Sequence, residues 1–230
     1  VEEMEAYDWC VKSNGKLKAI GDADKTATTD LKNELLKLGK PVYLNRNLAS
    51  KELISISEQV IEATKKDDLK VKIGYFSGSI THNENFNLIM PAILQILKEF
   101  PQTELHLVGH LTIPDEMKSY QKQLVSHDFL DWTALPALVA EMDINLAPLV
   151  DTVFNRAKSE IKTVNTRSES LKCSLACFTT IASDLGSFSE AIKQEQTGIL
   201  VADELWYEKL KVLVSDKTQS KDLGSQAKSQ

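Results

Sequence analysis

KIGYFSGSITHNENFNLIMPAILQILKEFPQTELHLVG occupies residues 72–109 and shows the pattern that decides the fold. Two short runs rich in apolar and β-branched residues, 72–77 and 104–109, lie on either side of a longer segment, 87–100, that has the apolar spacing of a helix. Alternation of short strands with longer helices is typical of a parallel sheet covered by helices. The stretch therefore predicts a strand, a helix and a second strand of one such sheet.

The same alternation continues along most of the chain. Further strands are expected at 41–45, 143–148, 178–183 and 198–202. Helical spacing marks 31–39, 51–63, 114–124, 133–142, 168–176, 187–194 and 203–214. The pattern predicts an α/β protein with a Rossmann-like parallel sheet and helices on both faces, preceded by a partial α/β segment.

A charged stretch, TKKDDLK at 64–70, is the best candidate linker. We place a domain boundary there, which gives a partial segment at 1–66 and a complete domain at 67–230. The chain begins with Val1 rather than Met. We therefore expect it to be a piece of a longer protein or a processed product.

Composition narrows the class of protein. The 230 residues are 42% hydrophobic and 26% charged, with a net charge of −6, so the chain has a globular composition and no surplus of positive charge for nucleic acid. No apolar run approaches the roughly 20 residues that span a bilayer, and no secretory signal is evident, so a cytoplasmic location is expected. Three cysteines, Cys10, Cys173 and Cys177, do not indicate a disulfide framework.

The loop after the first strand of the main domain is the first candidate site, because ligands of open parallel sheets bind beyond the carboxyl ends of the strands. Gly78 allows a close approach of the backbone to a ligand. Hydroxyl and imidazole donors follow in the same loop: Ser77, Ser79, Thr81 and His82. These residues favour a phosphate cradle, but an ordinary strand-to-helix turn capped by Asn83 or Asn85 explains them as well.

The second candidate site is FNRAKSEIKTVNTRSES, residues 154–170, which follows the strand at 143–148. Arg156 and Lys158 can neutralise an anion, while Glu160 and Glu169 can accept hydrogen bonds from hydroxyl groups. The set suits a sugar phosphate. The alternative is a solvated helix N-terminus with charges in no particular order.

Three stretches carry a family resemblance. They are IGYFSGSITHNENFNLIMPAILQILKEFPQTELHLVG, FLDWTALPALVAEMDINLAPLVDTVFNRAKSEIK and TIASDLGSFSEAIKQEQTGILV. Residues 70–215 resemble the donor-binding half of the retaining nucleotide-sugar glycosyltransferases of family 4, which have two domains in the GT-B arrangement. The bacterial polysaccharide and rhamnan-type branch, with its THN loop and N-x-A-K-S-E signature, is the most similar. Residues 1–66 resemble the end of the acceptor-side domain and the hinge.

The resemblance implies a role for each matching residue. Those expected to hold the diphosphate of the donor are Ser77, Gly78, Ser79, Thr81 and His82. Arg156 and Lys158 would offset the charge that develops on the departing nucleotide. Trp132, in FLDWTAL, would lie beside the nucleotide base, unless it is a core or rim residue. The family mechanism needs no metal and no cofactor beyond the nucleotide-diphosphate sugar.

One family signature is altered here. The family places a pair of glutamates, with seven residues between them, across a helix start to bind the sugar and the ribose. Alignment from the AKSEIK side puts Asn165 at the second position, whereas alignment from SESLKCSLACFTTIAS puts Glu169 there. The first position falls on Ala157 or Ile161, with Glu160 nearby.

Two functions follow from the resemblance. The first is an enzyme domain that transfers a hexosyl or rhamnosyl group, with retention, from a nucleotide-diphosphate sugar to a saccharide or polysaccharide acceptor. The second is a non-catalytic domain of the same fold, kept for nucleotide binding or subunit assembly. A partner subunit or peripheral membrane association is compatible with either function.

Overall fold

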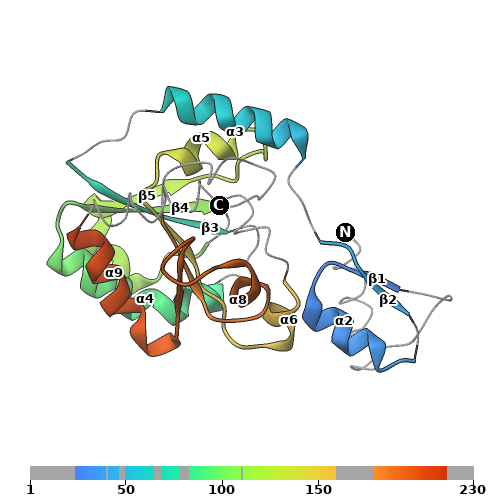
Figure 1. Ribbon diagram of the computed structural model, residues 1–230. Coiled ribbons are helices and arrows are strands. Elements are labelled where there is room, and N and C mark those ends of the chain that lie inside the picture. The colour runs from blue at the N-terminus through green and yellow to red at the C-terminus, as the bar shows by residue number, and fades with distance from the viewer. Residues whose placement is uncertain are drawn as a thin grey trace.

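The structure, a computed structural model, describes residues 24–39, 41–46, 50–64, 69–77, 83–109, 111–158 and 179–216. They form a six-stranded domain and a smaller lobe beside it (Figure 1). None of the helices in these ranges is long and apolar enough to cross a bilayer.

The main domain is built on a sheet in which every strand is parallel to its neighbours, with the order β5-β4-β3-β6-β7-β8. The strands are β3 (Val71–Ser77), β4 (Thr103–Gly109), β5 (Leu124–His127), β6 (Ile144–Ala147), β7 (Thr179–Ser183) and β8 (Ile199–Val201). Numbered within this sheet, the order is 3-2-1-4-5-6, which is that of a Rossmann fold. The predicted α/β parallel sheet is therefore confirmed.

Helices cover both faces of the sheet, as predicted. α4 (Asn83–Glu99) and α9 (Trp206–Ser215) pack together on one face, where their buried residues join those of the strands in the main core (Figure 1). α5 (Leu135–Ala140) and α8 (Ser187–Ala191) lie on the other face, over smaller apolar clusters. The alternation of strand residues between these clusters is what a sheet covered on both faces requires.

Polar contacts fix α9 to α4 at the edge of the main core. The Tyr207 hydroxyl lies 2.8 Å from Glu99 Oε1, and Lys211 Nζ donates to Glu99 Oε2 at 3.1 Å. Hydrogen bonds from Tyr207 and then Lys211 hold the pKa of the exposed Glu99 carboxyl below its ordinary value.

The smaller lobe consists of β1 (Asp24–Thr26), α2 (Thr29–Leu36) and β2 (Val42–Leu44), with the two strands parallel. Thr28 caps α2, because its Oγ1 accepts a hydrogen bond from the backbone N–H of Leu31 at 3.3 Å. α3 (Lys51–Ala63) follows the lobe and packs on α5, where Val60 joins an apolar cluster with Val139. The predicted boundary between residues 66 and 67 stays a prediction.

Four elements differ from the sequence predictions. The segment predicted as a helix at 114–124 is a 3₁₀ helix, η2 (Asp115–Gln123), and it runs directly into β5, which was not predicted. β1 was also missed, as was the one-turn helix α6 (Val153–Arg156). The predicted helix at 168–176 lies outside the described residues.

Candidate functional site

The strand order reverses between β3 and β6, and this switch point is where open α/β sheets bind ligands. Ser77, the last residue of β3, is buried with 5% of its surface exposed. β6 ends at Ala147, on the other side of the switch point. The carboxyl ends of these two strands lie at the same edge of the sheet, and in the sequence each strand is followed by one of the candidate segments.

Gly109 allows β4 to end tightly against β3. Its φ is +87°, and a Cβ atom at this position would lie 2.1 Å from the carbonyl oxygen of Ser77. A glycine is needed here for both reasons, since other residues rarely adopt this conformation and none could fit the space. The backbones of the last residues of β3 and β4 therefore lie in close contact.

The segment after β6 is fixed by side-chain hydrogen bonds. Ser183 Oγ on β7 accepts from the backbone N–H of Leu149 at 2.9 Å. Thr152 Oγ1 accepts from the backbone N–H of Asn155 at 3.1 Å and caps α6. These bonds place the residues at the end of α6 beside the switch point.

Lys158, two residues beyond α6, is half-buried, with its charged end enclosed. Its Nζ is enclosed, has no hydrogen-bond partner among the described residues, and lies 4.8 Å from the ring centroid of Phe154. Burial lowers the pKa of Lys158 to about 8, because the charged form loses its hydration. A buried ammonium of this kind is costly unless a negative group accompanies it.

Arg156 has a different environment from Lys158. Its Nε and Nη2 donate to the two carboxylate oxygens of Asp151, each at 2.6 Å, in a bidentate and solvent-exposed ion pair. This pair raises the pKa of Arg156 and lowers that of Asp151. Arg156 and Asp151 together carry no net charge, so Lys158 is the uncompensated cation of this segment among the described residues.

The start of α8 holds the end of α6 in place. Gly186 has a φ of +55°, and a Cβ atom there would lie 2.8 Å from the carbonyl oxygen of Arg156. Ser187 Oγ donates to the carbonyl oxygen of Lys158 at 2.8 Å. The backbone of both cationic residues is thus in contact with the segment that follows β7.

A pair of buried asparagines joins the two sides of the switch point, and sequence reasoning missed its role. Asn85 Oδ1, in the first turn of α4, accepts from the backbone N–H of Val150 at 2.9 Å and from Asn155 Nδ2 at 2.8 Å. The sequence had suggested Asn83 or Asn85 as a cap for a helix starting near residue 87. α4 begins at Asn83 instead, and Asn83 Oδ1 accepts from the backbone N–H of Thr112 at 3.3 Å.

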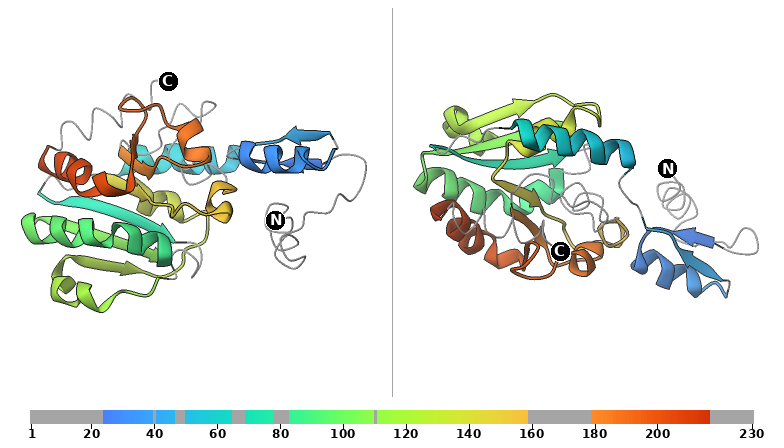
Figure 2. Two further views of the ribbon diagram at one scale, coloured as in Figure 1. Left: turned by 90° about the horizontal axis from the view of Figure 1, so that it is seen from below. Right: turned by 45° about the horizontal axis from the view of Figure 1, so that its top comes forward.

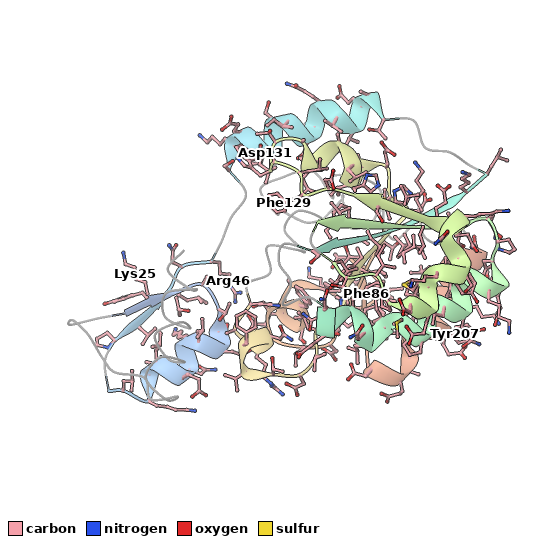
Figure 3. The ribbon with its side chains drawn as sticks, turned by 180° about the vertical axis from the view of Figure 1, so that it is seen from behind. Lys25, Arg46, Phe86, Phe129, Asp131 and Tyr207 are labelled. Carbon is pink, nitrogen blue, oxygen red and sulfur yellow. The ribbon has the colours of Figure 1, made fainter. Side chains whose placement is uncertain are left out.

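Trp132 lies in the loop between β5 and α5, at the carboxyl end of the sheet, and 48% of its surface is exposed. Phe129 in the same loop is 61% exposed. Its Cδ2 atom would lie 3.8 Å from a Cβ atom placed on Gly109. Figure 3 shows Phe129 and Asp131 on this loop, above the sheet. The exposed indole ring of Trp132 is of the kind that stacks on a planar ligand.

The remaining predicted site residues lie outside the described residues. They are Gly78, Ser79, Thr81, His82, Glu160 and Glu169. Their roles, and the identity of the glutamate at the altered signature, stay predictions.

Comparison with known protein families finds a match over the six-stranded domain. The family model described as "Glycosyl transferases group 1" matches residues 71–216. No curated protein matches the sequence.

Several solved glycosyltransferase structures are similar in fold. Anabaena HepE, solved in complex with UDP and glucose, has a TM-score of 0.59 and 13% identity, and the match covers 100% of this chain and 62% of HepE. WaaG, a glycosyltransferase involved in lipopolysaccharide biosynthesis, has a TM-score of 0.66 and 11% identity over 89% of this chain and 57% of WaaG.

A separately solved domain gives a third comparison. The C-terminal domain of LpcC from Francisella tularensis, a group 1 family protein, has a TM-score of 0.53 and 19% identity over 75% of this chain and 89% of that domain. This chain spans less than two thirds of HepE, and these likenesses concern the fold. Because the family model covers more than half of the chain and includes both sides of the switch point, the protein belongs to the group 1 family of glycosyl transferases.

Proposed function

We propose that this chain binds a nucleotide-diphosphate sugar at the β3/β6 switch point and serves as the donor-binding half of a retaining, family 4 glycosyltransferase of the polysaccharide or rhamnan type. The acceptor is a saccharide or polysaccharide. In the reaction, the bond between the anomeric carbon and the diphosphate oxygen breaks, and the acceptor hydroxyl oxygen bonds to the same face of that carbon. The hydroxyl proton passes to the departing diphosphate.

The observation that carries this proposal is the state of Lys158. Its ammonium nitrogen is enclosed on the segment that follows β6, has no hydrogen-bond partner among the described residues, and has a pKa lowered to about 8 by burial. A diphosphate beside this group supplies the missing counter-charge and stabilises the ammonium. Charge on the leaving group grows as the glycosidic bond breaks, so the same contact stabilises the transition state more than the bound donor.

The other site residues have supporting roles in this proposal. Arg156 is paired with Asp151 in the free protein, and in this proposal donor binding turns it toward the phosphates. The loop with Trp132 lies where a base can stack. The proposal includes no metal, because Lys158 carries the neutralising charge. HepE was solved with UDP and glucose, which supports a uridine nucleotide as the first probe.

The experiment is a calorimetric titration of this chain with UDP, GDP, dTDP, ADP and CDP, followed by the sugar conjugates of whichever diphosphate binds. We expect one base to be preferred and one sugar to strengthen the binding. Retention is then read by NMR from the anomeric configuration of the first glycoside formed. Failure of all five diphosphates to bind a folded sample would contradict the proposal.

A further inference from the structure

We infer that Asn85 and Asn155 form an amide brace that holds α6 against the start of α4 and thereby positions Lys158 at the switch point. The two asparagines are positioning residues rather than catalytic ones. The consequence of this brace for nucleotide binding rests on the proposed function, but the brace itself can be tested without a ligand.

Asn85 and Asn155 are both buried and are hydrogen-bonded to each other. Asn85 has 1% of its surface exposed and Asn155 has 6%. They are 70 residues apart in the sequence and come from opposite sides of the switch point, yet Asn155 Nδ2 lies 2.8 Å from Asn85 Oδ1. Buried polar side chains are costly unless they are hydrogen-bonded, so two amides here need a specific structural reason.

Both backbone groups of Val150 are used by the pair. The Val150 N–H donates to Asn85 Oδ1 at 2.9 Å, and the Val150 carbonyl oxygen accepts from Asn155 Nδ2 at 2.8 Å. The loop between β6 and α6 is therefore bonded to both asparagines at one residue. Lys158 follows Asn155 by three residues, and its backbone N–H donates to the Asn155 carbonyl oxygen at 3.2 Å.

The chemistry of the contacts fixes the orientation of both amides. A backbone N–H only donates, so Asn85 must present its oxygen to Val150. A carbonyl oxygen only accepts, so Asn155 must present its NH₂ group to Val150 and to Asn85. An aspartate at position 85 would keep both of these bonds, whereas an aspartate at position 155 would place a third acceptor against two others.

This asymmetry gives a test with matched variants. Asn85→Asp and Asn155→Asp add the same charge and keep the size of the side chain. Asn85→Leu and Asn155→Leu remove the amide without adding charge. If the added charge alone disturbed the structure, the two aspartate variants would show the same hydrogen exchange. The two leucine variants would then exchange as the wild type does.

The first readout is hydrogen exchange, measured by mass spectrometry on the segment 150–158, with the β4 segment 103–109 as the internal control. We expect Asn85→Asp, which keeps both bonds although it adds a buried charge, to exchange more slowly in 150–158 than Asn155→Asp does. Asn155→Asp and Asn155→Leu should exchange at least tenfold faster than the wild type in 150–158 and not in 103–109. Asn155→Leu carries the test if Asn155→Asp does not fold. Equal exchange in Asn85→Asp and Asn155→Asp, or faster exchange in both segments, would overturn the brace.

The second readout is binding of UDP and of uridine. In Asn155→Leu, UDP affinity should fall at least tenfold while uridine affinity stays the same, because the displaced Lys158 contacts phosphate. Unchanged UDP affinity would show that the pair does not position Lys158 for a ligand. If the exchange pattern is as expected but the wild type binds no nucleotide, the brace stands and the proposed function fails.

Discussion

His106 on β4 shows how the fold sets the charge of a single side chain. It is 4% exposed, its Nδ1 lies 3.0 Å from His127 Nε2, and its Nε2 lies 3.6 Å from Glu104 Oε2. Burial lowers the pKa of His106, and the nearby His127 and Lys72 lower it further, whereas Glu104 opposes them. The imidazole therefore stays neutral in the folded protein at a pH where an exposed histidine is protonated.

A prediction about stability follows from this pKa. As pH falls below 6.5, the ordinary value, His106 gains a proton in the unfolded chain but not in the folded protein. The free energy of unfolding should therefore decrease by up to about 1.4 kcal/mol per pH unit for this one proton. Urea denaturation at several pH values between about 7.5 and 5 should show this slope, and His106→Gln should reduce it.

Glu104, the carboxylate beside His106, contributes to the pH dependence of the free energy of unfolding mainly at lower pH. The pKa of Glu104 is lowered, chiefly by its hydrogen bond with Lys70, so its contribution to stability begins to be lost near pH 5 and is lost mainly as pH falls through the ordinary value of 4.5. A slope that is unchanged in His106→Gln would show that another group takes up the proton.

At the scale of elements, the close approach of β4 to β3 depends on Gly109. Gly109→Ala combines an unfavourable φ of +87° with a Cβ atom 2.1 Å from the Ser77 carbonyl oxygen. Gly39 is the matched control, since its φ is +75° and a Cβ atom there would meet nothing within 4 Å.

We expect Gly39→Ala to lower the free energy of unfolding by about 1 kcal/mol, the cost of the left-handed conformation alone. Gly109→Ala should cost about 3 kcal/mol or more, because strand ends must also move apart. Denaturant unfolding checks both values. Similar losses in the two variants would mean that β4 can shift without disturbing the sheet.

Elements also show what the sequence could and could not reveal. β3, β4, β6, β7 and β8 were predictable, because buried parallel strands are apolar on both faces. β5 was missed because LVSH is a short edge strand that continues directly from η2. The motif predicts Lys158 as a site residue, which stays a prediction, whereas the enclosure of its ammonium nitrogen could not be predicted from the sequence. The Asn85–Asn155 pair was invisible because no local pattern links amides 70 residues apart.

At the scale of the whole molecule, a charged contact joins the smaller lobe to the six-stranded domain. Arg46 Nη2, just after β2, donates to Glu190 Oε2 on α8 at 2.6 Å, and Thr29 Oγ1 donates to the same oxygen at 3.0 Å. Figure 2 shows the lobe beside the larger domain, and Figure 3 shows Arg46 at the junction. The pair is partly exposed, so its contribution is about 1 kcal/mol or less.

Because the contact is this weak, we expect its loss to change the orientation of the lobe without unfolding the protein. Arg46→Glu should increase the radius of gyration measured by small-angle X-ray scattering, and Arg46→Glu combined with Glu190→Arg should restore it. Lys37→Glu is the control, because Lys37 pairs with Glu34 inside the lobe. If the double variant scatters like Arg46→Glu, a different contact sets the orientation.

The proposed contact between Lys158 and the diphosphate of a nucleotide sugar can be tested by calorimetric titration of UDP from pH 7 to about 9.5. The pKa of Lys158 in the free protein is about 8, and a bound diphosphate raises it. UDP affinity should therefore be nearly constant below pH 7.5 and fall up to about tenfold per pH unit above pH 8. Lys158→Met should bind UDP at least tenfold more weakly at pH 7, with no such pH dependence. Equal affinity in Lys158→Met and the wild type, or a flat pH profile in the wild type, would show that Lys158 does not bind the diphosphate.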